Sequence, residues 1–173
     1  GSGATIIRPN KIIADFTTIS AGTLTLFIRS EVGASTTSVV RGSTCELYNM
    51  NTPRATTIVN ASGNYPAIVR QQNNISTTNN TLLNVTDLEF NITASKIYTL
   101  DCNLLTTAAA ATTGVAVNVS TTATTSNINI LYDTWSSATA KVGFSSTSFD
   151  AVLTGTGGGA GVVYPHKVLA DFA

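Results

Sequence analysis

Apolar and polar side chains alternate along much of this chain, and a period of two predicts β-strands rather than helices. The clearest example is segment 23–32, TLTLFIRSEV, in which Leu24, Leu26 and Ile28 fall on one face. Mostly polar side chains fall on the other face. Successive side chains of a strand point to opposite sides of its sheet, so we expect one face of this strand to be buried.

Two shorter segments, 37–40 and 44–48, follow this strand, and we expect the three to form a meander. Within segment 82–92 the apolar positions shift phase at Thr86 and Asp87, which predicts a β-bulge. Further strands are expected at 96–105, 115–119, 128–132 and 141–149. Many short strands separated by turns predict an all-β protein, an antiparallel β-sandwich with a jelly-roll-like arrangement.

One region departs from the alternation. Residues 51–81 are largely polar and aperiodic, as in QQNNISTTNN at 71–80. Polar, aperiodic sequence is typical of connecting segments. We therefore expect a linker at 51–81, with one strand near Ile68 as the alternative for its apolar part.

A sixteen-residue segment occurs twice. Residues 1–16 read GSGATIIRPNKIIADF, and residues 157–172 read GGGAGVVYPHKVLADF. The identical pairs are Gly1/Gly157, Gly3/Gly159, Ala4/Ala160, Pro9/Pro165, Lys11/Lys167, Ala14/Ala170, Asp15/Asp171 and Phe16/Phe172. The offset, 157 − 1 = 156 residues, is the size of an ordinary domain. The chain is therefore expected to span one repeating unit of about 156 residues and to be cut inside that unit.

Each copy holds an apolar run, a proline and a second apolar run. A proline cannot donate a ladder hydrogen bond, so each copy is predicted to enter its sheet across a kink or to form an edge strand. If the unit is cut, each end lacks partners that the other end or another chain supplies.

Composition narrows the classes of partner. Charged residues make up 10% of the chain, and nine basic residues balance nine acidic ones. This balance gives no electrostatic reason to expect nucleic acid or an anionic membrane as a partner. No apolar run is long enough to cross a bilayer, so we predict no membrane insertion. Abundant Thr, Ser and Asn are common in extracellular and virion β-proteins.

The candidate chemistry is sparse. The single histidine, His166, is replaced by Asn10 in the other copy of the repeat, which argues against a catalytic or metal-binding role. No nucleophile elbow, zinc motif, phosphate loop or calcium loop is present. We therefore predict no enzyme activity, no catalytic residue, no metal and no cofactor. Cys45 and Cys102 lie in phase with aliphatic neighbours, which favours buried thiols, with a disulfide between them as the alternative.

Two stretches carry a family resemblance. Residues 21–48 (AGTLTLFIRSEVGASTTSVVRGSTCELY) resemble the closing strands of a β-sandwich domain found in tailed-phage virion proteins, such as tail fibres and head decoration proteins. Residues 83–119, which begin LNVTDLEF, resemble its opening strands. The order is reversed relative to that family, because here the closing strands come first. The resemblance thus implies closing strands at 1–50, a linker at 51–81, and at 82–173 the opening strands of the next unit or of the same, circularly permuted unit.

The resemblance implies a structural virion protein, a fibre or capsid-decoration domain that acts by self-assembly. Its expected partners are copies of itself and other virion proteins, and its expected location is the virion, outside the cell. One alternative is an extracellular adhesin module that binds a host-surface glycan, with Trp135 as the possible ligand contact. Another is a non-viral surface filament subunit, which six Asn-x-Ser/Thr sequons would suit. The predicted assembly contacts are Leu24, Leu26, Ile28, Val162, Val163, Val168 and Phe172.

Overall fold

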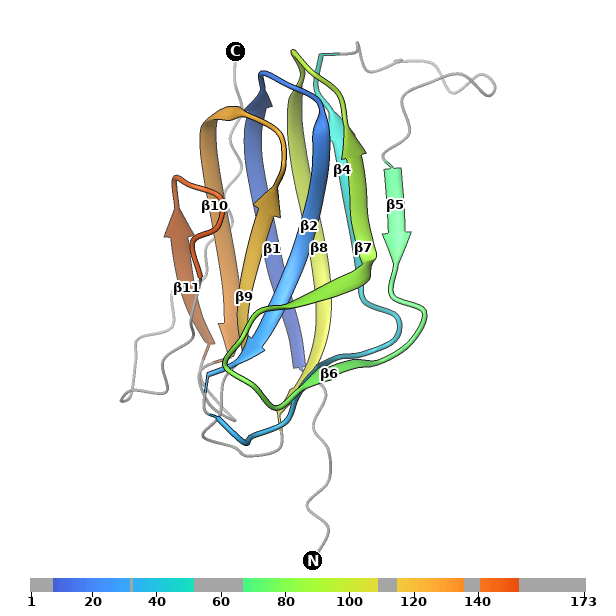
Figure 1. Ribbon diagram of the computed structural model, residues 1–173, viewed down its shortest axis with the longest axis vertical. Coiled ribbons are helices and arrows are strands. Elements are labelled where there is room, and N and C mark those ends of the chain that lie inside the picture. Colours follow the sequence, from blue (N-terminus) through green and yellow to red (C-terminus); the bar gives the residue numbers. More distant parts are fainter. Residues whose placement is uncertain (1–7, 32, 52–66, 109–114, 136–140, 153–173) are drawn as a thin grey trace, which may run out of the picture.

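The computed structural model describes residues 8–31, 33–51, 67–108, 115–135 and 141–152, and the statements below concern these residues. They form eleven β-strands, and none of the residues described lies in a helix. The strands pair antiparallel in two sheets that pack face to face (Figure 1). The predicted all-β, antiparallel sandwich is therefore confirmed.

The larger sheet, sheet A, has eight strands. Its first four strands are, in order, β11 (Lys141–Ser146), β10 (Thr125–Trp135), β1 (Arg8–Thr18) and β8 (Ile97–Ala108). Two short strands, β3 (Thr37–Val39) and β4 (Thr44–Asn49), both pair with β8. Beyond them, β6 (Ile75–Thr77) pairs with β3, and β5 (Ala67–Arg70) pairs with β4. The smaller sheet, sheet B, has the order β7 (Leu83–Ile92), β2 (Gly22–Ser30), β9 (Val115–Thr121). Sheet B lies in front of the centre of sheet A in Figure 1.

The predicted meander of three strands is wrong. The strand at 23–32 belongs to sheet B as β2, whereas β3 and β4 both pair with β8 in sheet A. Sequence alternation shows that a strand has a buried face but does not show which sheet covers it. The chain therefore crosses between the two sheets after β2.

Strands β3 and β4 behave as one strand with an interruption, and β6 and β5 run beside them with an interruption of their own. The residues between β3 and β4 are hydrogen-bonded to Gln71, which lies between β5 and β6. The Gln71 backbone amide donates to the Ser43 carbonyl (2.9 Å), and the Gly42 amide donates to the Gln71 carbonyl (3.0 Å). Gly42 has a φ of 97°, which glycine adopts without the steric cost that a side chain brings. Antiparallel pairing thus continues across the break.

Segment 51–81, predicted as a linker, contributes strands to sheet A in its described part. Strand β5 contains Ile68, as the alternative allowed, but β6 has only three residues and was not predicted. Such a short polar strand carries no usable periodicity. The division of the chain into closing strands, linker and opening strands stays a prediction.

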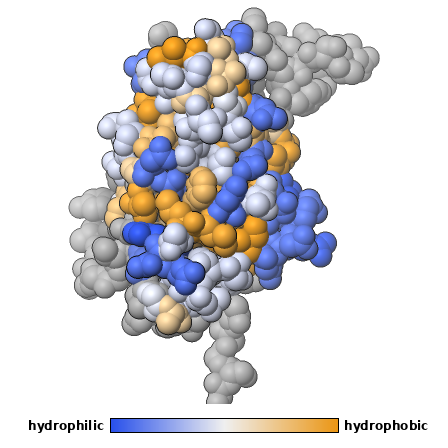
Figure 2. Space-filling view, in the orientation of Figure 1, coloured by the Kyte–Doolittle hydropathy of each residue, from blue (hydrophilic) through white to orange (hydrophobic). Residues whose placement is uncertain are grey.

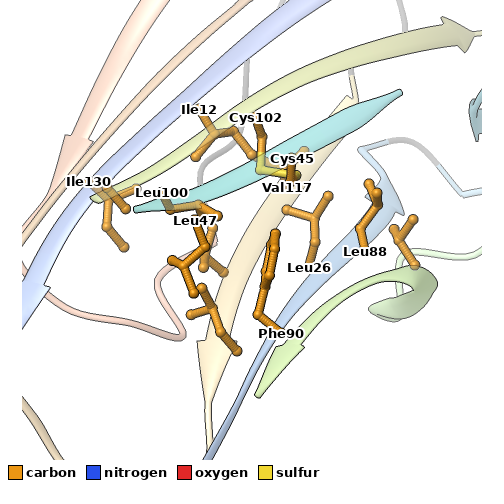
Figure 3. Close-up of a cluster of buried hydrophobic side chains, with 14 of the residues drawn as sticks. Ile12, Leu26, Cys45, Leu47, Leu88, Phe90, Leu100, Cys102, Val117 and Ile130 are labelled. Atoms are coloured by element: carbon orange, nitrogen blue, oxygen red, sulfur yellow. A yellow bond between two sulfur atoms is a disulfide. The ribbon is translucent and has the colours of Figure 1, made fainter. Parts of the chain in front are cut away.

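The core lies between the two sheets (Figure 3). Leu24, Leu26 and Ile28 are 2%, 3% and 0% exposed, as the alternation predicts. The predicted bulge is also confirmed, because the register between β2 and β7 shifts from Thr25–Glu89 to Phe27–Asn84. Between these pairs a single residue of β2, Leu26, faces residues 85–88 of β7, and the extra residues let both Val85 and Leu88 point into the core.

Candidate assembly site

The first copy of the repeated segment supplies β1, which is an inner strand of sheet A. It pairs with β8 from Arg8 to Thr17 and with β10 from Lys11 to Thr18. The edge-strand alternative is therefore wrong for this copy, and the second copy, residues 157–172, lies outside the described residues. Pro9 is accommodated because it lies at the start of β1, before the pairing with β10 begins. We call the place that β1 occupies between β8 and β10 the β1 slot.

Side chains on the inner side of β1 fill the core. Ile12, Ala14 and Phe16 are at most 1% exposed. The Phe16 ring stacks on Tyr98 with ring centres 5.6 Å apart, and it meets Phe149 edge-on at 5.2 Å. Burial of one such aromatic side chain is worth about 1.5–3 kcal/mol. The inner side of the slot therefore contributes most of what holds β1 in the sheet.

Ala14 has the smallest of the buried side chains on the inner side of β1. It lies opposite Leu100 on β8 and opposite Ile130 on β10, and all three residues are buried. Inserting a much larger side chain into a packed core is destabilising. A long, charged residue at position 14 is therefore not compatible with β1 in the slot.

The outer side of β1 carries polar contacts that set its register. The Lys11 ammonium forms an ion pair with the Asp101 carboxylate and donates to the Asn103 side-chain oxygen at 3.3 Å. The Thr99 hydroxyl donates to Asp15 at 2.6 Å. The Lys11 and Asp101 side chains are 36% and 32% exposed, so solvent screens the pair and its net contribution is about 0.5 kcal/mol. These contacts form only in the observed register of β1 with β8, and they add little to its stability.

The two ends of β1 are fixed by side-chain hydrogen bonds. Asn10 is 4% exposed, and its amide donates to the Thr106 hydroxyl at 2.6 Å. At the other end the Thr18 hydroxyl donates to the Thr93 carbonyl at 2.6 Å and accepts from the Lys96 amide at 3.0 Å. Buried polar groups left without partners would be costly, so these bonds also favour one register.

A disulfide braces the other side of β8. Cys45 of β4 and Cys102 of β8 are directly opposite in the sheet and are bonded, with 4.1 Å between their Cα atoms. The preference for buried thiols is therefore wrong and the disulfide alternative is correct. Both cysteines lie in phase with core residues, which the sequence shows, but the register that brings them together is not readable from spacing alone. A disulfide is consistent with an extracellular location.

The predicted assembly contacts divide into two groups. Leu24, Leu26 and Ile28 lie inside the sandwich of their own chain, and their contact with a second chain stays a prediction. The other four, Val162, Val163, Val168 and Phe172, lie outside the described residues. The backbone of Trp135 ends β10 opposite Lys141, but its side chain also lies outside the description.

Exposed apolar side chains come from several elements, and three of them, Tyr48, Met50 and Ile97, lie at neighbouring positions where β4 ends and β8 begins, where the Met50 amide donates to the Ile97 carbonyl at 2.8 Å. The face formed by β7, β2 and β9 shows apolar patches between polar ones (Figure 2). The large apolar residues exposed by at least 37% are Ile19, Tyr48, Met50, Ile68, Leu82, Leu83 and Ile97. Among the described residues no three acidic, histidine or cysteine side chains gather as a metal site would require. No helix in this part of the chain could cross a membrane.

The sequons differ in accessibility. Asn74, Asn79 and Asn91 are exposed, whereas Asn118 is 1% exposed and donates to the Ala151 carbonyl at 3.3 Å. A glycan needs a surface asparagine, so Asn118 cannot carry one in this fold.

Comparison of the chain with protein-family models, with curated proteins and with solved structures finds no match. The resemblance to tailed-phage virion domains therefore stays a prediction.

Proposed function

We propose that this protein is a structural β-sandwich of a tailed-phage virion, a fibre or capsid-decoration domain that acts by assembling with copies of itself. One observation carries the proposal. The sequence of β1, an inner strand of sheet A, is present a second time at residues 157–172. A chain that holds two versions of one inner strand has the means to pair with another molecule of its kind.

Two further properties support a role outside the cell. The Cys45–Cys102 disulfide is of the kind that persists in oxidising surroundings. The low charge and abundant Thr, Ser and Asn fit a surface exposed on a particle. The phage assignment itself depends on the resemblance of residues 21–48 and 83–119 to virion domains.

Sedimentation velocity of the oxidised, full chain tests self-assembly. We expect species at multiples of 17.9 kDa whose proportion rises with protein concentration. A single species of 17.9 kDa at every concentration up to the millimolar range would contradict the proposal.

The location needs a separate experiment. Mass spectrometry of purified phage particles should find peptides of this chain at a fixed ratio to the major capsid protein. Their absence from particles, with the chain present in the lysate, would contradict the virion assignment and leave self-assembly intact.

A further inference from the structure

We propose that residues 161–172 of one molecule occupy the β1 slot of a second molecule, between β8 and β10, so that molecules join by strand exchange. This inference depends on the proposed self-assembly and names the site that would perform it. The partner is a second copy of this chain, and the contact is an inner strand rather than a surface patch.

The identical positions of the repeat are the positions where β1 makes specific contacts. Ala14 fits between Leu100 and Ile130, and the second copy has Ala170. Phe16 stacks on Tyr98, and the second copy has Phe172. A strand placed in the slot with Phe172 in the position of Phe16 therefore meets the same requirements for shape.

The polar contacts are preserved in the same register. Lys167 corresponds to Lys11, which pairs with Asp101. Asp171 corresponds to Asp15, which accepts a hydrogen bond from Thr99. A shift of one residue would turn both charged side chains into the core, so the alternation and the charges favour the same alignment.

The substitutions between the copies are mild where the site is buried. Val168 replaces Ile12, whose side chain is fully buried, and fills that place with one methylene less. Leu169 replaces Ile13. His166 replaces Asn10, and an imidazole N–H is a donor that can serve the Thr106 hydroxyl as the Asn10 amide does. The slot thus accepts the second copy somewhat less well than its own β1.

The walls of the slot stay in place when β1 leaves. The Cys45–Cys102 bond keeps β8 attached to β4, and a short turn, residues 122–124, joins β10 to β9 of sheet B. Strand β1 itself is attached to β2 by the turn at residues 19–21. Its removal therefore opens the position between β8 and β10, and β10 then stays attached through its turn to β9 and through the buried Ile130 and Tyr132.

The attachment of β1 sets the condition for exchange. The short turn to β2 keeps β1 at high effective concentration near its own slot, so β1 occupies the slot in dilute protein. The second copy follows Phe149 in the chain, and Phe149 packs on Phe16 at the end of the slot where the incoming strand has to finish. A second molecule can bring its strand to the slot without running back along it, and the exchanged fraction is therefore expected to rise with protein concentration.

Disulfide trapping in the full chain tests the exchange. Ile13 lies opposite Leu131 of β10, so Leu169 of the incoming strand would lie opposite Leu131 as well. The variant carrying Leu169→Cys and Leu131→Cys should give covalent dimers and larger species on oxidation, at least five-fold more than Leu169→Cys paired with Phe27→Cys of sheet B. Adding Ala170→Arg should abolish them, and adding Ala160→Arg, outside the exchanged strand, should not.

A second variant biases the competition for the slot. Ala14→Arg prevents β1 from entering its own slot, so only residues 161–172 can fill it. We expect this variant to stay folded and to contain at least twice the oligomer fraction of the unmodified chain, whereas Ala14→Arg with Ala170→Arg should not fold.

The outcomes separate the two proposals. Oligomers in sedimentation without cross-linking between positions 169 and 131 overturn strand exchange and leave self-assembly standing. Cross-linked monomers alone show that the second copy enters its own slot, which also overturns exchange between molecules. The absence of any oligomer overturns the proposed function itself.

Discussion

Strand β8 is held in different ways on its two sides. Toward β4 it is bonded covalently, through Cys102 and Cys45. Toward β1 it relies on backbone pairing, on the stacking of Phe16 against Tyr98 and on the ion pair of Lys11 with Asp101. Both sides bury core residues to a similar degree. The difference therefore lies in reversibility, with a permanent neighbour on one side and a replaceable one on the other.

The largest loss of stability is expected when the disulfide between β8 and β4 is removed. A loop closed across 57 residues stabilises the folded chain by about 4 kcal/mol in the chain-entropy model. Replacing both Cys45 and Cys102 by Ser should lower the free energy of unfolding by about that amount, as measured by chemical denaturation. A reducing agent should destabilise the unmodified chain similarly and leave the double variant unchanged. A loss below about 1 kcal/mol would show that the bond does little to brace the sheet.

The next largest effect comes from weakening the replaceable side. Phe16→Ala removes the ring that packs on Tyr98 and Phe149 and should cost about 3 kcal/mol of unfolding free energy. Phe27→Ala is the matched control, because Phe27 is only partly buried and faces away from the core. We expect that control to lose less than half as much by the same measurement. Equal losses would mean that the slot is not a special part of the core.

A third test addresses the attachment of β1 to sheet B. A Cβ atom at Gly22 would lie 2.5 Å from the Ala123 amide nitrogen and 2.7 Å from the Thr122 hydroxyl oxygen. Gly22→Ala should therefore cost about 2 kcal/mol, the usual effect of overpacking. Gly33 has no atom within 4 Å of such a Cβ, so Gly33→Ala should leave the thermal midpoint nearly unchanged. Similar midpoints for the two variants would contradict this account of Gly22.

The smallest loss of stability is expected from removing the ion pair on the outer side of β1. Lys11→Met removes the ion pair with Asp101 and should cost about 0.5 kcal/mol at low salt, because both side chains are partly exposed. The cost should shrink further in molar salt, which screens exposed charges. Asp101→Asn should behave alike, and a salt-independent loss would mean that the Lys11 stem, rather than its charge, makes the contribution.

Much of the fold was predictable from local patterns. Alternation identified β2 and β8 with their buried faces, and the phase slip at Thr86 and Asp87 identified the bulge of β7. Sheet membership was not predictable, because β3 and β4 carry the same local pattern whichever sheet they join. The sequence does not decide between free thiols and a disulfide for the same reason, since the bond depends on the register of two strands that are distant in sequence.

The sequence predicted part of the candidate site, namely the repeated segment, but not its position in the sheet. The repeat marked residues 1–16 as unusual, but an internal proline suggested an edge or a kink rather than the middle of a sheet. The position of β1 depends on β8 and β10, which lie about a hundred residues further along the chain and are brought beside it by tertiary packing. Long-range pairing of this kind leaves no trace in one strand's own residues.

The paired interruptions near Gly42 and Gln71 have one more consequence. An unbroken outer strand is a template on which further strands can add, and such growth leads to aggregation. Strands β5 and β6 instead form short pieces separated by the bend at 71–74, with Gln72, Asn73 and Asn74 turned to solvent. This rim of the sheet is therefore a poorer template for added strands than an unbroken strand of the same length would be.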